Sequence, residues 1–202
     1  GDDPDADRVA ARRGEAEAVV TLLGHKAKNH PQQVGRSGSA DDVDDRATTL
    51  DVFGPLNERY GPFTVDVAAA AHNTKVERFY DRTTDGLAQS WAGERVWCNP
   101  PYSSIEPWIR KAWAESATAD VIVMLLPANR TEQGWWQDLV EPYRDRPGSP
   151  LRSEFIRGRL RFISPHRDHV GMNERPPFGN VLLIWQRIQP DPPLVLDFGE
   201  AS

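Results

Sequence analysis

Continuous apolar runs and helically spaced apolar residues alternate along this chain from about residue 48 onward. The predicted strands at residues 120–127 and 180–186 are apolar almost throughout, as in strands buried on both faces of a parallel sheet. Less regular apolar runs at 63–69 and 95–98 predict two earlier strands. This succession of strands and helices predicts a three-layer α/β fold with a mainly parallel central sheet.

Apolar residues at helical spacing predict three helices between these strands. Their apolar faces are Phe53, Leu56 and Tyr60 in the first, Ile105, Trp108, Ile109, Ala112 and Trp113 in the second, and Trp136, Leu139, Val140 and Tyr143 in the third. Gly61-Pro62 would end the first helix. The second has two candidate starts, a capping box of Ser103 and Glu106 or a first turn at Pro107.

The stretch before the last strand also shows a pattern. Residues 144–152 are rich in Pro and Arg and predict a loop, whereas basic and apolar residues alternate from 155 to 162, as in a strand with a cationic face. Residues 76–80 are a candidate short strand. Because no helix is predicted between 155–162 and 180–186, we expect an antiparallel strand at that end of the sheet.

The N-terminal part of the chain differs in composition from the rest. After an Asp-rich start, a modest apolar stripe predicts a helix within residues 1–30, and the polar stretch PQQVGRSGSADDVDDR at 31–46 predicts a flexible linker. We therefore expect residues 1–46 to be a helix and linker, and residues 47–202 to form one domain. A homodimer contact is one hypothesis for the N-terminal helix.

Composition narrows the cellular context. The 202 residues contain one cysteine, so no disulfide can form within the chain, which suits a reducing cytoplasm. Cys98 lies in a predicted strand, and we interpret it as a packing residue. No apolar run approaches the length of a membrane span. We expect a soluble cytoplasmic protein that makes no contact with a membrane.

Charge is unevenly distributed. The formal net charge is −6, but residues 144–187 carry nine basic and four acidic side chains. One basic face on an acidic body is compatible with nucleic-acid binding. Arg157, Arg159 and Arg161 are candidate phosphate contacts; a solvated strand face is an equally good interpretation on charge alone.

The most informative stretch is Asn99-Pro100-Pro101-Tyr102, which follows the predicted strand at 95–98. The two prolines keep the backbone extended, so the Asn99 side chain and the Pro100 carbonyl are presented at the carboxyl end of the strand. Ligands bind at that end of open α/β sheets. The alternative is an ordinary strand–turn–helix junction, in which the prolines only end the strand and have no role in ligand binding.

In this setting the tetrapeptide resembles the signature of amino-group methyltransferases that use S-adenosylmethionine. The lone pair of an adenine amino group is delocalised into the ring, so the nitrogen is a poor nucleophile. Two acceptors, the Asn99 side-chain oxygen and the Pro100 carbonyl, could bind both amino hydrogens and direct the lone pair toward the methyl group. Tyr102 would stack on a base that has left the duplex. An Asn99 that is buried, or turned away from any cavity able to admit a nucleobase, would contradict this hypothesis.

A longer likeness surrounds the motif. The stretch from about Thr48 to Gln186 resembles the phage-type, Dam-like DNA N6-adenine methyltransferases. The matching pieces are TVDVAA at 64–69, HNTK at 72–75, DGLAQSW at 85–91, residues 95–103, LLP at 125–127 with Arg130-Thr131 and Trp135-Trp136, RGRLRF at 157–162 and PFG at 177–179. Such a protein would come from a phage or prophage in a bacterial host.

The resemblance implies a Rossmann-like class I methyltransferase fold and assigns candidate site residues. On that pattern S-adenosylmethionine would contact Asp66 and Ala68 at its methionine end, Asp85 and Leu87 at its adenine, and Thr48 or Thr49 at its carboxylate. The catalytic residues would be Asn99, Pro100, Pro101 and Tyr102. DNA would contact Ser103, Arg130, Arg157, Arg159 and Arg161.

Two departures from the family pattern weaken the cofactor assignments. The family often has Thr-Pro where this chain has Thr48-Thr49-Leu50, and Val67-Ala68-Ala69 follows Asp66 in place of a Gly-rich turn. Asp66 is equally plausible as a strand-end or cap carboxylate, and Asp85 as a plain turn residue.

The sequence leaves other functions open. The same motif chemistry suits cytosine N4, an RNA base or a protein glutamine, although DNA cytosine enzymes more often have Ser at the position of Asn99. A non-catalytic DNA-binding or assembly module that keeps the fold is a third hypothesis. His166 and His169 are spaced His-x-x-His, but no cluster of further ligands accompanies them, so we expect no metal.

Overall fold

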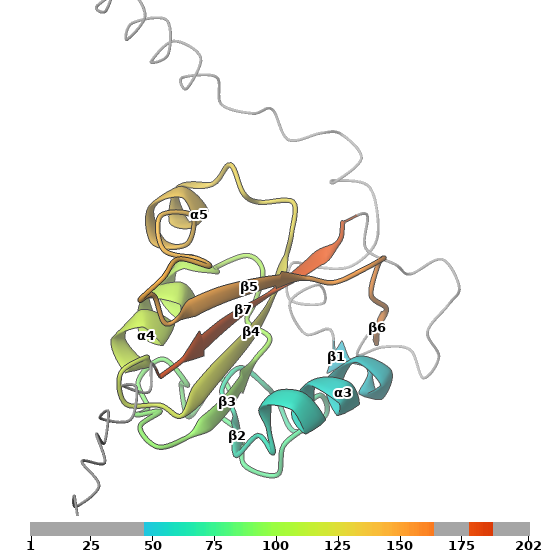
Figure 1. Cartoon of the computed structure of the whole chain (residues 1–202). Coiled ribbons are helices and arrows are strands. Elements are labelled where there is room, and N and C mark those ends of the chain that lie inside the picture. Colours follow the sequence, from blue (N-terminus) through green and yellow to red (C-terminus); the bar gives the residue numbers. More distant parts are fainter. Residues whose placement is uncertain (1–46, 164–177, 188–202) are drawn as a thin grey trace, which may run out of the picture. The chain divides into compact units, whose positions relative to one another are not determined.

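The computed structural model describes residues 47–163 and 178–187 (Figure 1). The predicted N-terminal helix, linker and homodimer contact within residues 1–46 lie outside the described residues. His166 and His169 do as well. The domain boundary at residue 47 therefore stays a prediction.

A five-stranded sheet forms the centre of the described structure, in the order β2-β3-β4-β7-β5. The strands are β2 (Val65–Asp66), β3 (Arg95–Cys98), β4 (Val121–Pro127), β7 (Asn180–Gln186) and β5 (Leu151–Phe155). The first three are parallel, and β7 is antiparallel to both β4 and β5. Four strands thus share one direction, which confirms the predicted Rossmann-like α/β fold. The antiparallel strand lies one place in from the edge.

Both faces of the sheet are covered. All seven residues of β4 are buried, as are all residues of β7 except Gln186. Along β4, Ile122, Met124 and Leu126 pack into one cluster and Val121, Val123 and Leu125 into the other. A continuous apolar run is needed because neither face of these strands meets water.

Three helices supply the covering layers: α3 (Leu50–Tyr60), α4 (Glu106–Glu115) and α5 (Gly134–Leu139). The first cluster contains the buried residues of α4 and α5, whereas Phe53 of α3 packs into the second. The two clusters lie on opposite faces, with α4 and α5 on one side of the sheet and α3 on the other (Figure 1). Cys98 is fully buried, as the packing interpretation predicted.

The structure resolves the alternative starts of α4. The helix begins at Glu106 after Ile105, with no side-chain cap and with Pro107 in its first turn. The third helix is shorter than its predicted apolar face, because α5 ends at Leu139.

The predicted strand at 155–162 is wrong. The strand β5 begins at Leu151, inside the predicted loop, and ends at Phe155. Gly158 has φ of 85°, a left-handed conformation that interrupts an extended strand. The chain then enters β6 (Phe162–Ile163), which pairs with β1 (Ala47–Thr48) in a separate two-stranded antiparallel sheet.

The candidate strand at 76–80 is reduced to a single bridge between Phe79 and Asp66. No helix among the described residues has both the length and the apolar character needed to cross a membrane.

Candidate active site

The Asn-Pro-Pro-Tyr motif follows β3, between the ends of β2 and β4, at the carboxyl edge of the parallel strands. The Val67 N–H donates to the Trp97 carbonyl (3.1 Å), so β2 and β3 stay together up to the motif. Pro100 is buried, whereas Asn99, Pro101 and Tyr102 are half-buried. The backbone first turns where the Ser104 N–H donates to the Pro101 carbonyl (3.1 Å).

The two proposed acceptors lie within this rigid segment. The Oδ1 atom of Asn99 is buried, so a ligand could reach it only after covering groups move. Within residues 47–163 and 178–187, no hydrogen bond is made to the Pro100 carbonyl. Two residues further on, the Tyr102 carbonyl accepts a hydrogen bond from the Arg130 guanidinium (3.1 Å).

Residues from the C-terminal half of the sheet surround the Tyr102 side chain. Its ring contacts Phe162 (centroids 6.5 Å apart, 87° between planes) and Phe178 (6.2 Å, 60°). The Asn180 Nδ2 donates to the Tyr102 hydroxyl (3.4 Å). Burial raises the pKa of Tyr102, so the hydroxyl is neutral at any physiological pH.

A cavity of about 490 Å³ opens beside the motif at the end of β2. It is lined by Val67, Ala68, Ala69, Ala70, Asn73, Tyr80, Asp81, Arg82, Thr83, Asp85, Gly86, Pro101 and Trp108. Two of the six predicted cofactor residues, Ala68 and Asp85, are among them. Leu87 instead packs against the core, and Asp66 lies directly before the lining residue Val67. The cavity size is within the range of small-molecule sites.

The loop that closes this cavity lies very close to β2. A Cβ atom placed on Gly86 would be 2.0 Å from the Val67 carbonyl oxygen, so only glycine fits there. The Trp91 indole N–H donates to the Gly86 carbonyl (2.9 Å). Asp85 has a left-handed backbone (φ 48°) and its Oδ1 accepts from the Leu87 N–H (3.1 Å). Asp85 is thus both a turn residue and a cavity residue.

The buried carboxyl group of Asp66 is the main electrostatic feature. It is 3% exposed, and burial raises its pKa to about 7. The Ala68 N–H (3.4 Å) and the nearby charge of Lys75 oppose that rise. Burial in turn lowers the pKa of Lys75. A cationic ligand group beside Asp66 would favour its ionised form.

Thr48 and Thr49 lie at the N-terminal end of α3 and not among the residues that line this cavity. Their hydroxyl oxygens are buried and have no hydrogen-bond partner among the described residues. Thr49 precedes the first turn of α3, and its carbonyl accepts from the N–H groups of Val52 and Phe53. A helix N-terminus with hydroxyl groups suits an anionic group.

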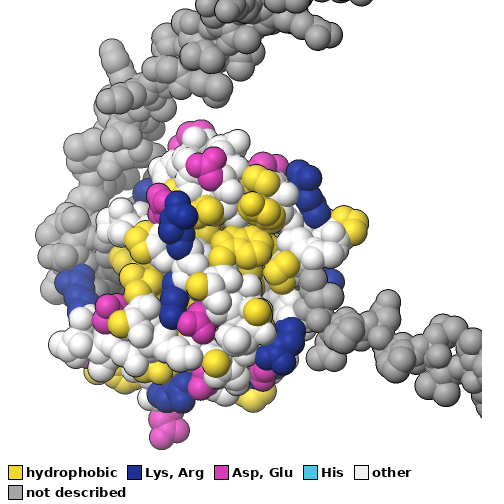
Figure 2. All heavy atoms as spheres, turned by 90° about the vertical axis from the view of Figure 1, so that its left-hand side faces the viewer, with side chains coloured by type: hydrophobic (Ala, Val, Ile, Leu, Met, Phe, Trp, Pro, Cys, Tyr) yellow, Lys and Arg dark blue, Asp and Glu magenta, His cyan; other side chains and the backbone are white. Residues whose placement is uncertain are grey.

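The predicted DNA contacts fall into two groups. Arg157, Arg159 and Arg161 are exposed on the irregular segment between β5 and β6, at the carboxyl edge of the sheet (Figure 1). Ser103 and Arg130 form the second group beside the motif: Ser103 is exposed, and the half-buried Arg130 donates to the Tyr102 carbonyl. On the face that carries α4 and α5, basic and acidic side chains are interspersed around apolar ones (Figure 2), so that face is not uniformly positive.

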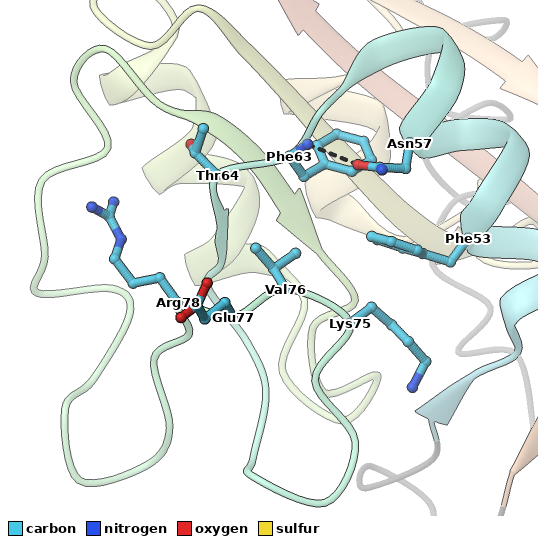
Figure 3. Close-up of a pocket in the computed structure, with 8 residues that line it drawn as sticks. All are labelled: Phe53, Asn57, Phe63, Thr64, Lys75, Val76, Glu77 and Arg78. Carbon is cyan, nitrogen blue, oxygen red and sulfur yellow. Dashed lines mark hydrogen bonds between the residues drawn. The ribbon is translucent and has the colours of Figure 1, made fainter.

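A second cavity, of about 620 Å³, lies between α3 and the segment 75–78 (Figure 3). It is lined by Phe53, Asn57, Phe63, Thr64, Lys75, Val76, Glu77 and Arg78. None of these residues belongs to the motif. Among the described residues, no group of three or more His, Cys, Asp or Glu side chains could hold a metal ion.

Sequence patterns did not assign Asn180, Phe178 or Gly86 to the site. One signal was present: Asn180 is polar and is followed by five apolar residues of the same strand, where a buried amide needs a partner. The approach of Gly86 to β2 depends on tertiary packing and leaves no such signal.

A mainly parallel Rossmann-like sheet with a ligand-sized cavity at its carboxyl edge is the arrangement in which open α/β proteins bind small-molecule ligands. Comparison with protein families is more specific. The chain belongs to the DNA N-6-adenine-methyltransferase (Dam) family, whose model matches residues 37–195. The predicted family resemblance is confirmed.

Two relatives carry the name DNA N-6-adenine-methyltransferase. One, from Escherichia phage T1, is 36% identical over 86 residues, which are 42% of this chain and 36% of the relative. The other, from Haemophilus phage HP1, is 35% identical over 78 residues, 38% of this chain and 44% of the relative. The aligned part therefore spans less than half of either relative.

Among solved structures, this fold is similar to a proposed RNA methyltransferase, PH1948 from Pyrococcus horikoshii. The superposition covers 86% of this chain and 98% of the other, with a TM-score of 0.40 and 11% identity. A likeness this distant carries no argument about activity.

Proposed function

We propose that the chain is a methyltransferase that uses S-adenosylmethionine to methylate the N6 amino group of adenine in double-stranded DNA. The observation that carries the proposal is the position of Asn99-Pro100-Pro101-Tyr102, held at the carboxyl end of β3 with Pro101 lining the cavity beside it. Family membership supports it. Both named relatives are phage proteins, which favours the cytoplasm of a bacterial host as the place of action.

The residues present fit such a cofactor. When bound, S-adenosylmethionine supplies an electrophilic methyl group on a sulfonium. The cavity offers a flat apolar wall at Trp108 and an acid at Asp85 for the adenosine end. Asp66 would face the cationic part of the methionine, and the hydroxyl groups of Thr48 or Thr49 would face its carboxylate. Their burial without partners among the described residues supports that role.

The motif would activate the acceptor nitrogen without taking a proton. The Asn99 Oδ1 and the Pro100 carbonyl would each accept one amino hydrogen of adenine, which localises the lone pair on nitrogen. The extended backbone holds both oxygens in a fixed geometry, so orientation supplies most of the rate gain. After transfer, the nitrogen loses one proton to water. Because the Asn99 Oδ1 is buried, DNA binding must also uncover it.

Duplex DNA would be held from the same edge. Arg157, Arg159 and Arg161 would contact phosphates and Ser103 would lie beside the extruded base, since phosphate contacts position a duplex without reading its sequence. Arg130 would act next to Ser103, where its guanidinium already contacts the motif. The target base must leave the helix to reach Asn99.

The test is methyl transfer from labelled S-adenosylmethionine to DNA fragments of varied sequence, followed by nucleoside analysis of the product. We expect N6-methyladenine with the wild-type chain and a loss of at least about a hundredfold with Asn99→Ala. Asn99→Asp, which keeps an acceptor oxygen and the side-chain volume, is the matched control and should retain more activity than Asn99→Ala.

Equal activity of the wild type and Asn99→Ala would contradict the proposed mechanism. If the product is methylcytosine, methylated RNA or methylated glutamine, the chain is a methyltransferase that acts on an amino group other than adenine N6. Calorimetry separates an inactive binding module from an enzyme, because such a module would show no saturable heat with S-adenosylmethionine.

A further inference from the structure

Asn180 is the one strongly polar side chain among the buried residues of β7. It is 1% exposed, and the register pairs it with Pro127 at the end of β4. The Ile156 N–H donates to its carbonyl (2.9 Å), so β4 and the end of β5 both fix its backbone. A buried amide is costly unless its polar atoms are hydrogen-bonded, and its partners therefore indicate what it does.

The Asn180 amide bridges the sheet and the motif. Its Nδ2 donates to the Leu126 carbonyl (3.3 Å) and to the Tyr102 hydroxyl (3.4 Å). Its Oδ1 is buried and has no hydrogen-bond partner among the described residues. An apolar residue would fill this position of β7 without leaving an unused acceptor. The amide is thus suited to a contact that an apolar side chain could not make.

The contact of Asn180 with Tyr102 differs from those of the neighbouring rings. Phe162 and Phe178 are inclined to the Tyr102 ring by 87° and 60°, so they limit its rotation through apolar contact. Asn180 is the described side chain that binds the hydroxyl group. The two rings thus contact the Tyr102 ring, and Asn180 holds its hydroxyl end. No aromatic pair among the described residues places a parallel ring on Tyr102.

We propose that Asn180 is a positioning residue, which holds the Tyr102 ring through its hydroxyl in the plane on which the target base stacks. It acts through Tyr102 and makes no contact with the methyl donor. The inference deepens the proposed function and rests on it. Its competitor is a purely structural role, in which Asn180 only joins β7 to the Leu126 carbonyl of β4.

A double-mutant cycle separates the two roles. The four proteins are the wild type, Asn180→Leu, Tyr102→Phe and the double variant. Leucine keeps the volume of the amide and removes its hydrogen bonds, and phenylalanine keeps the stacking ring and removes the hydroxyl. For each protein, the methylation kcat on duplex DNA and the Kd for S-adenosylmethionine by calorimetry are measured.

We expect each single variant to lower kcat about tenfold, which is less than the roughly hundredfold loss that a misplacement of about 1 Å can cause. The double variant should be no slower than the slower single variant, and the Kd for S-adenosylmethionine should stay within about twofold throughout. If Asn180→Leu does not fold, Asn180→Val, which suits a strand and also removes the hydrogen bonds of the amide, takes its place in the same cycle.

Three outcomes would overturn the inference. An unchanged kcat in Asn180→Leu would show that the amide positions nothing. Multiplied losses in the double variant would show that Asn180 acts independently of Tyr102, as the structural role requires. A wild-type chain that binds S-adenosylmethionine but methylates no DNA would refute the proposed function itself, and the inference with it.

Discussion

The Arg130 guanidinium donates a hydrogen bond to the Tyr102 carbonyl at 3.1 Å. Arg130 belongs to the loop after β4 and Tyr102 to the loop after β3, so the contact ties together two neighbouring loops at the carboxyl edge of the sheet. Hydrogen bonds from charged donors are stronger than neutral ones. The contact therefore stiffens the segment that presents Asn99 and Pro100.

We expect Arg130→Ala to reduce the single-turnover methylation rate about tenfold or more, because the motif loses the hydrogen bond that holds the Tyr102 carbonyl in place. Arg130→Lys should recover part of that rate, since an ammonium can reach a carbonyl but cannot bind it as a fork. DNA affinity should change less than the rate in both variants. A fall in affinity with an unchanged rate would assign Arg130 to phosphate binding alone.

The arginines beyond β5 should behave in the opposite way. Replacing Arg157, Arg159 and Arg161 together by alanine should weaken DNA binding and reduce the slope of log K against log salt by about 0.9 for each lost phosphate contact. The control is Arg110→Ala, because Arg110 is exposed on α4 and paired with Glu106. An unchanged slope in the triple variant would show that these arginines only face solvent.

Asp66 should make folding stability depend on pH. Its pKa is about 7 in the folded chain against an ordinary value of 3.8, so between these values the folded state holds a proton that the unfolded state has lost. The stability that Asp66 contributes is therefore fully present below about pH 4 and is lost as pH rises through 7. Asp66→Asn should remove that fall, a gain of roughly 2–4 kcal/mol at pH 8. Urea unfolding at pH 5 and 8 measures it, with the exposed Asp51→Asn as control.

The same group should couple cofactor binding to protons. If the cationic methionine end of S-adenosylmethionine faces Asp66, binding lowers the pKa of that carboxyl group from about 7 and releases a proton at pH values just below 7. Affinity should then rise with pH up to about 7. Calorimetry in buffers of different ionisation enthalpy detects the proton. Binding by Asp66→Asn should be weaker and release none; equal proton release by both proteins would place the cofactor elsewhere.

Gly86 gives a purely steric prediction. Gly86→Ala would place a methyl group 2.0 Å from the Val67 carbonyl oxygen, and because both are held by backbone, the loop must leave β2. We expect a destabilisation of about 1–3 kcal/mol and weaker S-adenosylmethionine binding. Gly54→Ala is the matched control: Gly54 lies within α3 with open space around it, so alanine should stabilise the chain by about 0.5–1 kcal/mol. Thermal unfolding compares the two.

The parts of the fold that the sequence predicted are those with a strong local signal. Residues 121–127 are apolar throughout and α4 has one apolar face, so one-dimensional patterns were sufficient. The edge strand β5 was missed because only Leu151 of its five residues is buried. The strands β1 and β6 are only two residues long each. Strands this short have no recognisable sequence pattern, so their pairing can be seen only in the tertiary structure.

The candidate site divides in the same way. The extended Asn-Pro-Pro segment at the end of β3 followed from the geometry of proline, which acts locally. The contact between Tyr102 and Asn180 links residues 78 positions apart. It depends on the register between β4 and β7, which no local pattern encodes. The cavity beside Pro101 likewise needs the approach of Gly86 to β2.

The place of β7 between β4 and β5 has a consequence for biosynthesis. During translation, β5 emerges from the ribosome before β7 and has no strand to join, because its partner in the sheet is still unmade. The sheet can be completed only after residue 186 has left the exit tunnel. A nascent chain released before that point would leave the backbone N–H and C=O groups along one edge of β4 unpaired, and such an edge can pair with another chain.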